Sequence, residues 1–166
     1  MGGVSAWPRW IVGARPRRTL VRTAVLAVVC LVVFGLVLRP VRVSGISMEP
    51  TVHDGTFRFG LLTAYAFAEP RVGDIVMVRL AGRRVMYLKR ILATPGETAQ
   101  FRAGGLWVDG ALRPEPYVRL AGEWQTDPIP LRAGEYLVAG DNRSAPLDRH
   151  MAGVTTRDRI EGRLAW

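Results

Sequence analysis

Residues 84–92 read RVMYLKRIL, an apolar run that carries the one lysine of the chain. Turn-forming residues bound this run, Ala-Gly before it and Thr-Pro-Gly after it. A short apolar run between such turn signals predicts a β-strand. Because alternate side chains of a strand share a face, Lys89 is expected on the face of Val85, Tyr87 and Ile91.

Short runs of the same kind continue through the chain from Val41 onward, separated by Gly, Pro and Asp. No 12-residue window outside the N-terminal segment has convincing helical periodicity. The Asp-Gly pair at 109–110 predicts a hairpin, and four prolines within 114–130 indicate a surface excursion that stays out of the core. The predicted strands are residues 41–46, 56–62, 74–80, 84–92, 98–102, 106–108, 135–139 and 162–166.

The whole chain has 166 residues, 49% of them hydrophobic, which excludes two full-sized domains and a disordered polyelectrolyte. The strands therefore predict one mainly β domain over residues 41–166, with a small inserted β-rich lobe around 97–134. A single cysteine, Cys30, excludes an internal disulfide and a cysteine-built zinc site. We expect no metal and no cofactor.

Residues 20–38, LVRTAVLAVVCLVVFGLVL, are apolar apart from Arg22. As a helix these 19 residues would span about 28 Å, close to the hydrocarbon thickness of a bilayer. A buried core helix would show polar positions on one face, and a cleavable signal would need small residues where Arg39 and Pro40 stand. The run therefore predicts one retained transmembrane helix, preceded by a basic tail over residues 1–19.

Basic residues concentrate in the N-terminal segment. The net charge is +9, yet residues 1–48 hold seven arginines and no acid, while the remainder holds 16 basic and 14 acidic residues. The body is close to neutral, so nucleic-acid binding is not expected. Five arginines precede or begin the span, and the positive-inside rule therefore places residues 1–19 in the cytoplasm and residues 41–166 outside.

Lys89 is the only lysine beside 22 arginines. An arginine keeps its proton in a protein, whereas a lysine amine can become neutral and act as a general base. An apolar face lowers the pKa of an amine, because burial removes hydration from its charged form. The alternative, a lysine at the strand edge with its head in water, stays open on periodicity alone.

Two polar segments complete the candidate chemistry. Residues 44–52, SGISMEPTV, place Ser47 after a strand-like run and before a proline, where its hydroxyl could be a nucleophile. A serine in such a turn can equally be only a turn residue. Residues 140–148, GDNRSAPLD, form a polar loop whose acids are expected to pair with Arg90 or Arg143.

In this order and behind an N-terminal span, these segments resemble the bacterial type I signal peptidases. The resemblance implies a signal-peptidase-like β domain and a serine endopeptidase in which Ser47 is the nucleophile and Lys89 the general base. The Ser47 main-chain N–H would donate to the oxyanion. The matching pieces are residues 44–52 (SGISMEPTV), 73–78 (GDIVMV), 87–97 (YLKRILATPGE) and 140–148 (GDNRSAPLD), followed by Gly153 and Val154.

The resemblance also implies the surroundings of this dyad. Shallow apolar pockets would accept the small-x-small pattern at signal-peptide cleavage sites. The implied substrate-binding positions are Val43, Gly45, Met48, Tyr87 and Leu88. A charged network that we interpret as structural would comprise Arg90, Asp141 and Asp148.

Gly45 has counterparts in family members that lack a hydroxyl at this place, whereas the sequence departs from the usual pattern at three positions in and after the last motif. Gly45 stands where some members have a serine that donates to the oxyanion, and Pro146 where a serine often binds the lysine amine. Arg149 and His150 replace a Ser-Arg pair. Ser144 is a candidate substitute for the missing hydroxyl.

The implied partners are the signal peptides of exported precursors and membrane lipid, at a bacterial plasma membrane crossed once. A narrower maturation protease with one or few substrates, and a non-catalytic homologue, are the alternatives. A self-cleaving repressor would need an N-terminal DNA-binding helix pair, where this chain has a span. A triad of Ser47, Asp148 and His150 is possible on composition, although we expect His53 and His150 at the surface.

Overall fold

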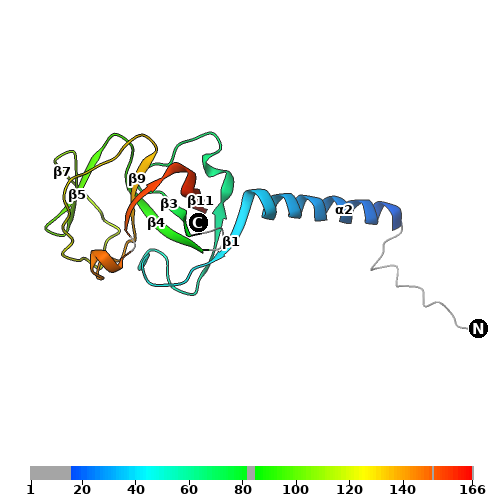
Figure 1. Ribbon diagram of the computed structural model, residues 1–166. Helices are drawn as coiled ribbons and strands as arrows, with labels where there is room; N and C mark the ends of the chain where they lie inside the picture. Colours follow the sequence, from blue (N-terminus) through cyan, green and yellow to red (C-terminus); the bar gives the residue numbers. More distant parts are fainter. Residues whose placement is uncertain (1–15, 82–84, 151, 166) are drawn as a thin grey trace, which may run out of the picture.

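A long apolar helix projects from a β-rich body in the computed structural model, which describes residues 16–81, 85–150 and 152–165 (Figure 1). Helix α2 (Pro16–Val32) continues through a π turn, η1 (Val33–Val37), directly into strand β1 (Leu38–Arg42). A proline disfavours helical geometry at the residue that precedes it. Pro40 acts in this way on Arg39, and both residues lie in β1. The expected apolar span thus ends at Val37, one residue earlier than predicted.

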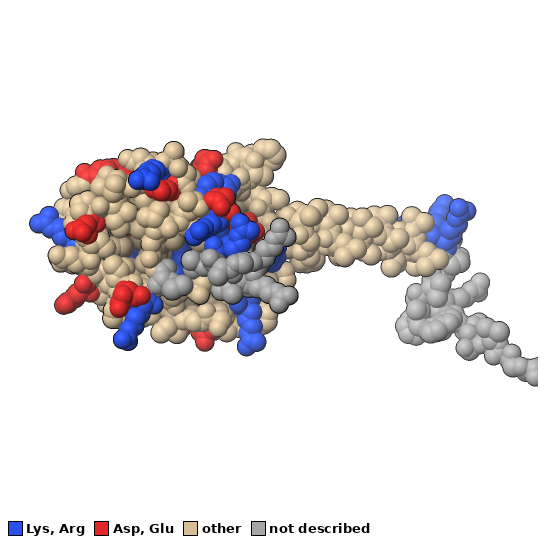
Figure 2. All heavy atoms as spheres, in the orientation of Figure 1, with Lys and Arg blue, Asp and Glu red and all other residues tan. Residues whose placement is uncertain are grey.

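The apolar helix is long enough to cross a bilayer. Residues Arg17–Val37 have a mean hydropathy of 2.7, and none of this stretch is buried against the body. Figure 2 shows a surface without charge along most of the helix, with basic residues at its N-terminal end. Acidic and basic side chains intermingle on the visible face of the body, in keeping with its nearly neutral composition.

A seven-stranded antiparallel sheet forms most of the body, in the order β1-β2-β11-β3-β4-β9-β10. Strand β4, the longest at nine residues, lies between β3 and β9. Short 3-10 turns connect several strands: η2 (Leu62–Tyr65), η3 (Leu147–Arg149) and η4 (Arg157–Arg159). Besides β1, the strands of this sheet are β2 (Phe57–Leu61), β3 (Ile75–Ala81), β4 (Val85–Ala93), β9 (Glu135–Ala139), β10 (Gly153–Thr156) and β11 (Ile160–Ala165).

A second, four-stranded sheet is inserted between β4 and β9 and lies at the end of the body opposite to α2 (Figure 1). Its strand order is β7-β6-β5-β8. Its buried residues form one cluster with Leu92 of β4 and Leu137 of β9, so the lobe shares its core with the main sheet. The strands are β5 (Thr98–Arg102), β6 (Gly105–Val108), β7 (Ala111–Arg113) and β8 (Ile129–Pro130).

The predicted mainly β class is confirmed, while several details differ. The predicted strand over 41–46 is wrong: β1 ends at Arg42, and the chain turns at Gly45, whose φ of +98° favours glycine. Strands β7, β8 and β10 were not predicted, since β7 has three residues and β8 only two. Strands this short carry too few residues to show an alternating pattern.

The proline-rich segment 114–130 is not wholly a surface excursion. Trp124 is 3% exposed and meets the ring of Phe101 edge-on, with centroids 5.1 Å apart. Its indole N–H donates to the main-chain oxygen of Ala145 at 2.8 Å. The segment therefore returns into the core through one aromatic residue, which the density of prolines concealed.

Candidate active site

Ser47 lies in the turn that follows β1, where it is half-buried. The loop after β9 holds its main chain: the Asn142 N–H donates to the Ser47 oxygen at 3.1 Å, and the Asn142 side-chain amide donates to Ile46 at 3.2 Å. A Cβ on Gly140 would lie 2.1 Å from that same Ser47 oxygen. Only glycine fits this approach, so residues 140–142 fix where the serine turn lies.

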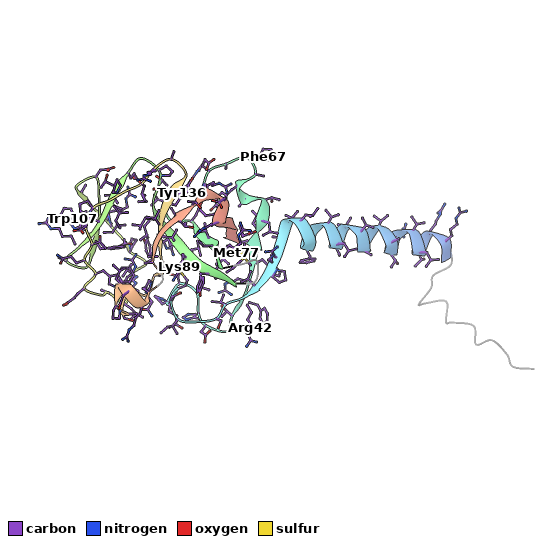
Figure 3. The ribbon with its side chains drawn as sticks, viewed as in Figure 1. Arg42, Phe67, Met77, Lys89, Trp107 and Tyr136 are labelled. Carbon is purple, nitrogen blue, oxygen red and sulfur yellow. The ribbon has the colours of Figure 1, made fainter. Side chains whose placement is uncertain are left out.

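Lys89 lies on β4, opposite Val76 of β3, and is 2% exposed. Figure 3 shows it inside the body, whereas Arg42 lies at the outer edge. It lines a cavity of about 200 Å³ together with Val78, Val138 and other residues. Burial and, to a smaller extent, the positive charge of Arg143 together lower the pKa of Lys89 to about 8. The alternative of a lysine with its head in water does not apply.

The Lys89 amine donates a hydrogen bond to the main-chain oxygen of His150 at 3.1 Å. Within the described part of the chain, no hydrogen bond joins it to the Ser47 hydroxyl. The turn that holds Ser47 and the strand that holds Lys89 nevertheless both contact the chain around Gly140. Gly140 abuts Ser47, and the next residue back, Ala139, pairs with Arg90, the neighbour of Lys89.

A groove of about 280 Å³ runs beside Ser47. Its walls include all the substrate-binding positions expected from the sequence: Val43, Gly45, Met48, Tyr87 and Leu88. Arg42 and Met86 line it too and were not predicted. Their signal was available in the sequence, since each neighbours a predicted position along the chain.

The expected charged network forms in part. Arg90 makes two hydrogen bonds to the fully buried Asp141 carboxylate, at 2.8 and 2.6 Å, and also donates to the Gly73 oxygen. The Tyr117 ring lies 4.1 Å from the Arg90 guanidinium carbon. The placement of Asp148 in this network was wrong. It is exposed on η3, and no ion pair links it to Arg90 among the described residues.

The prediction that His150 lies at the surface was also wrong, whereas His53 is exposed. His150 is 5% exposed, and its Nε2 accepts a hydrogen bond from the Gly140 N–H at 3.0 Å. Burial lowers the pKa of His150 to about 4, with the charges of Lys89 and Arg143 acting in the same direction. This geometry does not favour a histidine triad, because Nε2 accepts a hydrogen bond from Gly140 and no hydrogen bond joins the ring to Asp148 among the described residues.

Ser144 does not substitute for the hydroxyl missing at Pro146. Its hydroxyl donates to the side-chain amide oxygen (Oδ1) of Asn142 at 2.6 Å. The partner of Lys89 is instead a main-chain carbonyl, which no side-chain motif announces. Groups of three or more His, Cys, Asp or Glu side chains suited to a metal do not occur among the described residues.

Comparison with known proteins gives the family. The profile of the family described as "Signal peptidase, peptidase S26" matches residues 17–166. The chain belongs to the signal peptidase S26 family. An S26 peptidase is a hydrolase, so this chain is an enzyme of the serine peptidase class.

Two curated S26 relatives share about a third of their residues with this chain. A signal peptidase I of Bacillus licheniformis is 33% identical over 86% of this chain and 83% of its own length. Signal peptidase I T of Bacillus subtilis is 34% identical over 82% of this chain and 79% of its own length. A crystal structure of a signal peptidase I from Enterococcus faecalis superposes with a TM-score of 0.47 at 23% identity, covering 58% of this chain and 97% of that chain.

Proposed function

We propose that this chain is a membrane-anchored endopeptidase that removes signal peptides from exported precursors, with Ser47 as nucleophile and Lys89 as general base. The Lys89 amine would take the proton of the Ser47 hydroxyl as its oxygen attacks the scissile carbonyl carbon. The same amine would then return that proton to the leaving nitrogen. Water would hydrolyse the resulting acyl-enzyme and release the mature protein.

The observation that carries this proposal is the burial of Lys89. A lysine in water is almost entirely protonated near neutral pH and cannot accept a proton. With its pKa lowered to about 8, a substantial share of Lys89 is neutral in mildly alkaline solution. None of the many arginines could take this role, because a guanidinium keeps its proton.

The groove beside Ser47 supports small side chains at the cleavage site. Buried Val43 and Met48 and half-buried Leu88 line it, and we expect a large substrate side chain to clash with them. A small residue at every other position of an extended peptide fits a shallow apolar groove, because alternate side chains of a strand face the same way. A small-x-small preference is therefore the specificity that we propose.

The apolar span supports attachment to the plasma membrane, with residues 1–19 in the cytoplasm and the β domain outside. Substrate and enzyme would then share one bilayer. The signal peptide of a precursor is itself apolar, so membrane attachment raises its concentration near the groove. Lipid is in this sense a partner of the enzyme as well as its support.

Cleavage of a precursor with an Ala-x-Ala site, by the purified chain in detergent, tests the proposal. We expect at least a thousandfold loss of kcat in Ser47→Ala and Lys89→Met. Lys89→Arg should be equally inactive, because it keeps the charge but cannot accept a proton. Ser144→Ala is the matched control: among the described residues Ser144 makes its side-chain hydrogen bond to Asn142, and this variant should stay within about twofold of wild type.

Full activity of Lys89→Arg would reject the dyad. A panel of unrelated precursors separates general processing from a narrower role, since a dedicated maturation protease would cleave one precursor and leave the others intact. If the enzyme is correctly folded and none of the precursors is cleaved, the result would indicate the non-catalytic alternative.

A further inference from the structure

His150 is buried, yet it lies outside the groove that is lined by Ser47. Its imidazole meets two separate parts of the molecule. On one side, Nε2 accepts the Gly140 main-chain N–H, so the neutral ring must carry its proton on Nδ1. On the other side the ring packs against Trp124 of the inserted lobe, with centroids 4.4 Å apart and the planes at 66°.

The main chain of the same residue meets the lysine. Among the described residues, the carbonyl oxygen of His150 is the hydrogen-bond acceptor for the Lys89 amine. A lysine side chain has a flexible four-carbon stem, so its buried end points wherever an acceptor is provided. The position of the His150 main chain therefore decides where this amine lies.

The charged groups facing the imidazole are Lys89 and Arg143, and both disfavour its protonation. The ring consequently remains an acceptor for Gly140 over the range in which the enzyme would work. Gly140 also lies against the main-chain oxygen of Ser47. This one residue therefore contacts both the turn that holds Ser47 and the imidazole of His150. Lys89 and Ser47 are thus linked through three contacts: Lys89 to His150, His150 to Gly140, and Gly140 to Ser47.

We propose that His150 is a positioning residue of the reaction: its imidazole, held between Gly140 and Trp124, keeps its own carbonyl on Lys89 and so directs the amine. This inference rests on the proposed function of Lys89 as general base. It gives the inserted lobe a part in the chemistry, because Trp124 supplies one of the two surfaces that hold the ring. The His150 carbonyl also gives the Lys89 amine a hydrogen-bond partner, which Pro146 cannot do because a proline side chain has no hydroxyl.

A pair of variants at His150 tests this inference. His150→Leu keeps an apolar side chain of moderate size but has no acceptor for Gly140, whereas Gln can place its oxygen near the position of Nε2. We expect His150→Leu to lower kcat at least tenfold with KM within twofold of wild type. The acid limb of its pH profile should move up by about one unit, because water that reaches Lys89 restores the hydration of the ammonium. His150→Gln should recover most of kcat and the wild-type pH profile.

The control is His53→Ala, which removes the exposed histidine and should change nothing. Folded fractions of all variants are measured by thermal unfolding, since a merely structural role would lower the amount of active enzyme without moving the pH profile. A wild-type profile and kcat in His150→Leu would overturn the inference. So would a His150→Gln variant that is folded but as impaired as His150→Leu.

A second measurement needs neither activity nor a variant at His150. The chain has two histidines, so in His53→Ala protein labelled with ¹⁵N-histidine the remaining imidazole signal belongs to His150. At pH 6 in detergent it should show a neutral ring with its proton on Nδ1. A doubly protonated ring, or a proton on Nε2, would overturn the inference even if the Ser47 and Lys89 variants had established the dyad.

Discussion

Lys89 is surrounded by apolar strand residues, and its amine makes one hydrogen bond to a neutral carbonyl. Neither the apolar neighbours nor a neutral carbonyl stabilises the charged ammonium as strongly as a carboxylate would. Alternation places this lysine on an apolar face of its strand, but it leaves open whether the amine lies in water. The burial of Lys89 in the structure decides this, and the downward direction of its pKa shift follows from that burial.

The pH dependence of cleavage follows from this burial. The base acts only as the neutral amine, and the fraction of neutral amine rises with pH until the pKa of about 8 is passed. We therefore expect kcat/KM to rise about tenfold per pH unit below 7 and to level off above about 8.5. Steady-state kinetics over pH 5–10, on a precursor with an Ala-x-Ala site, would measure it.

A plateau already reached near pH 6.5 would point to histidine as the base and contradict the assignment. Lys89→Arg serves as the control, because its guanidinium cannot titrate in this range and any residual rate should lack the same limb.

The residues that escaped prediction do so for a physical reason. His150 acts on Lys89 through its main-chain carbonyl, which every residue possesses, so no side-chain type could have announced it. Asp148 was assigned to the charged network by motif position. In the structure Asp148 is exposed on η3 while Asp141 is buried against Arg90, and the sequence does not contain this difference in position.

Between elements, the most consequential contact joins the inserted lobe to the loop after β9. Arg143 of that loop forms an ion pair with Glu115 of the lobe at 2.6 Å, and both side chains are at least nine-tenths buried. The guanidinium carbon of Arg143 also lies 4.8 Å from the Trp124 ring and 5.1 Å from that of Phe101. Through this contact the lobe holds the loop that carries Gly140 and Asn142 against Ser47.

Removing the carboxylate of Glu115 should therefore lower the free energy of unfolding by more than the loss of an exposed ion pair would. Glu115→Gln leaves the Arg143 charge buried without its partner, and we expect the free energy of unfolding to fall by about 3 kcal/mol. Urea unfolding followed by tryptophan fluorescence would measure it. Glu161→Gln is the matched control: its pair with Arg79 is partly exposed and 3.4 Å long, so the loss should be below about 1 kcal/mol. Equal losses in the two variants would contradict this account.

Strand prediction succeeded where a run was long and bounded by turn residues, as for β4 and β5. It failed for β8, whose two residues pair with β5 because the lobe folds back on itself. Such a strand is defined by its partner rather than by its own pattern. The Asp-Gly turn at 109–110 did predict a hairpin, and β6 and β7 form it.

At the scale of the whole molecule, the apolar helix leads straight into the sheet. Strand β1 follows η1 without a linker and pairs along its full length with β2, and the Phe34 and Phe59 rings lie 6.4 Å apart. The body is consequently held close to the end of the span. Ser47 lies five residues after β1, so the turn that holds it is also close to the end of the span along the sequence.

The orientation of this arrangement can be tested with a reporter enzyme. Alkaline phosphatase becomes active only outside the cytoplasm, where its disulfides can form. Fused after Trp166, it should be active, because the arginines before the span keep the N-terminus inside. Fused after Thr19, before the span, it should be inactive. The reverse pattern would overturn the topology, and with it the access of Ser47 to exported precursors, while leaving the fold and the burial of Lys89 untouched.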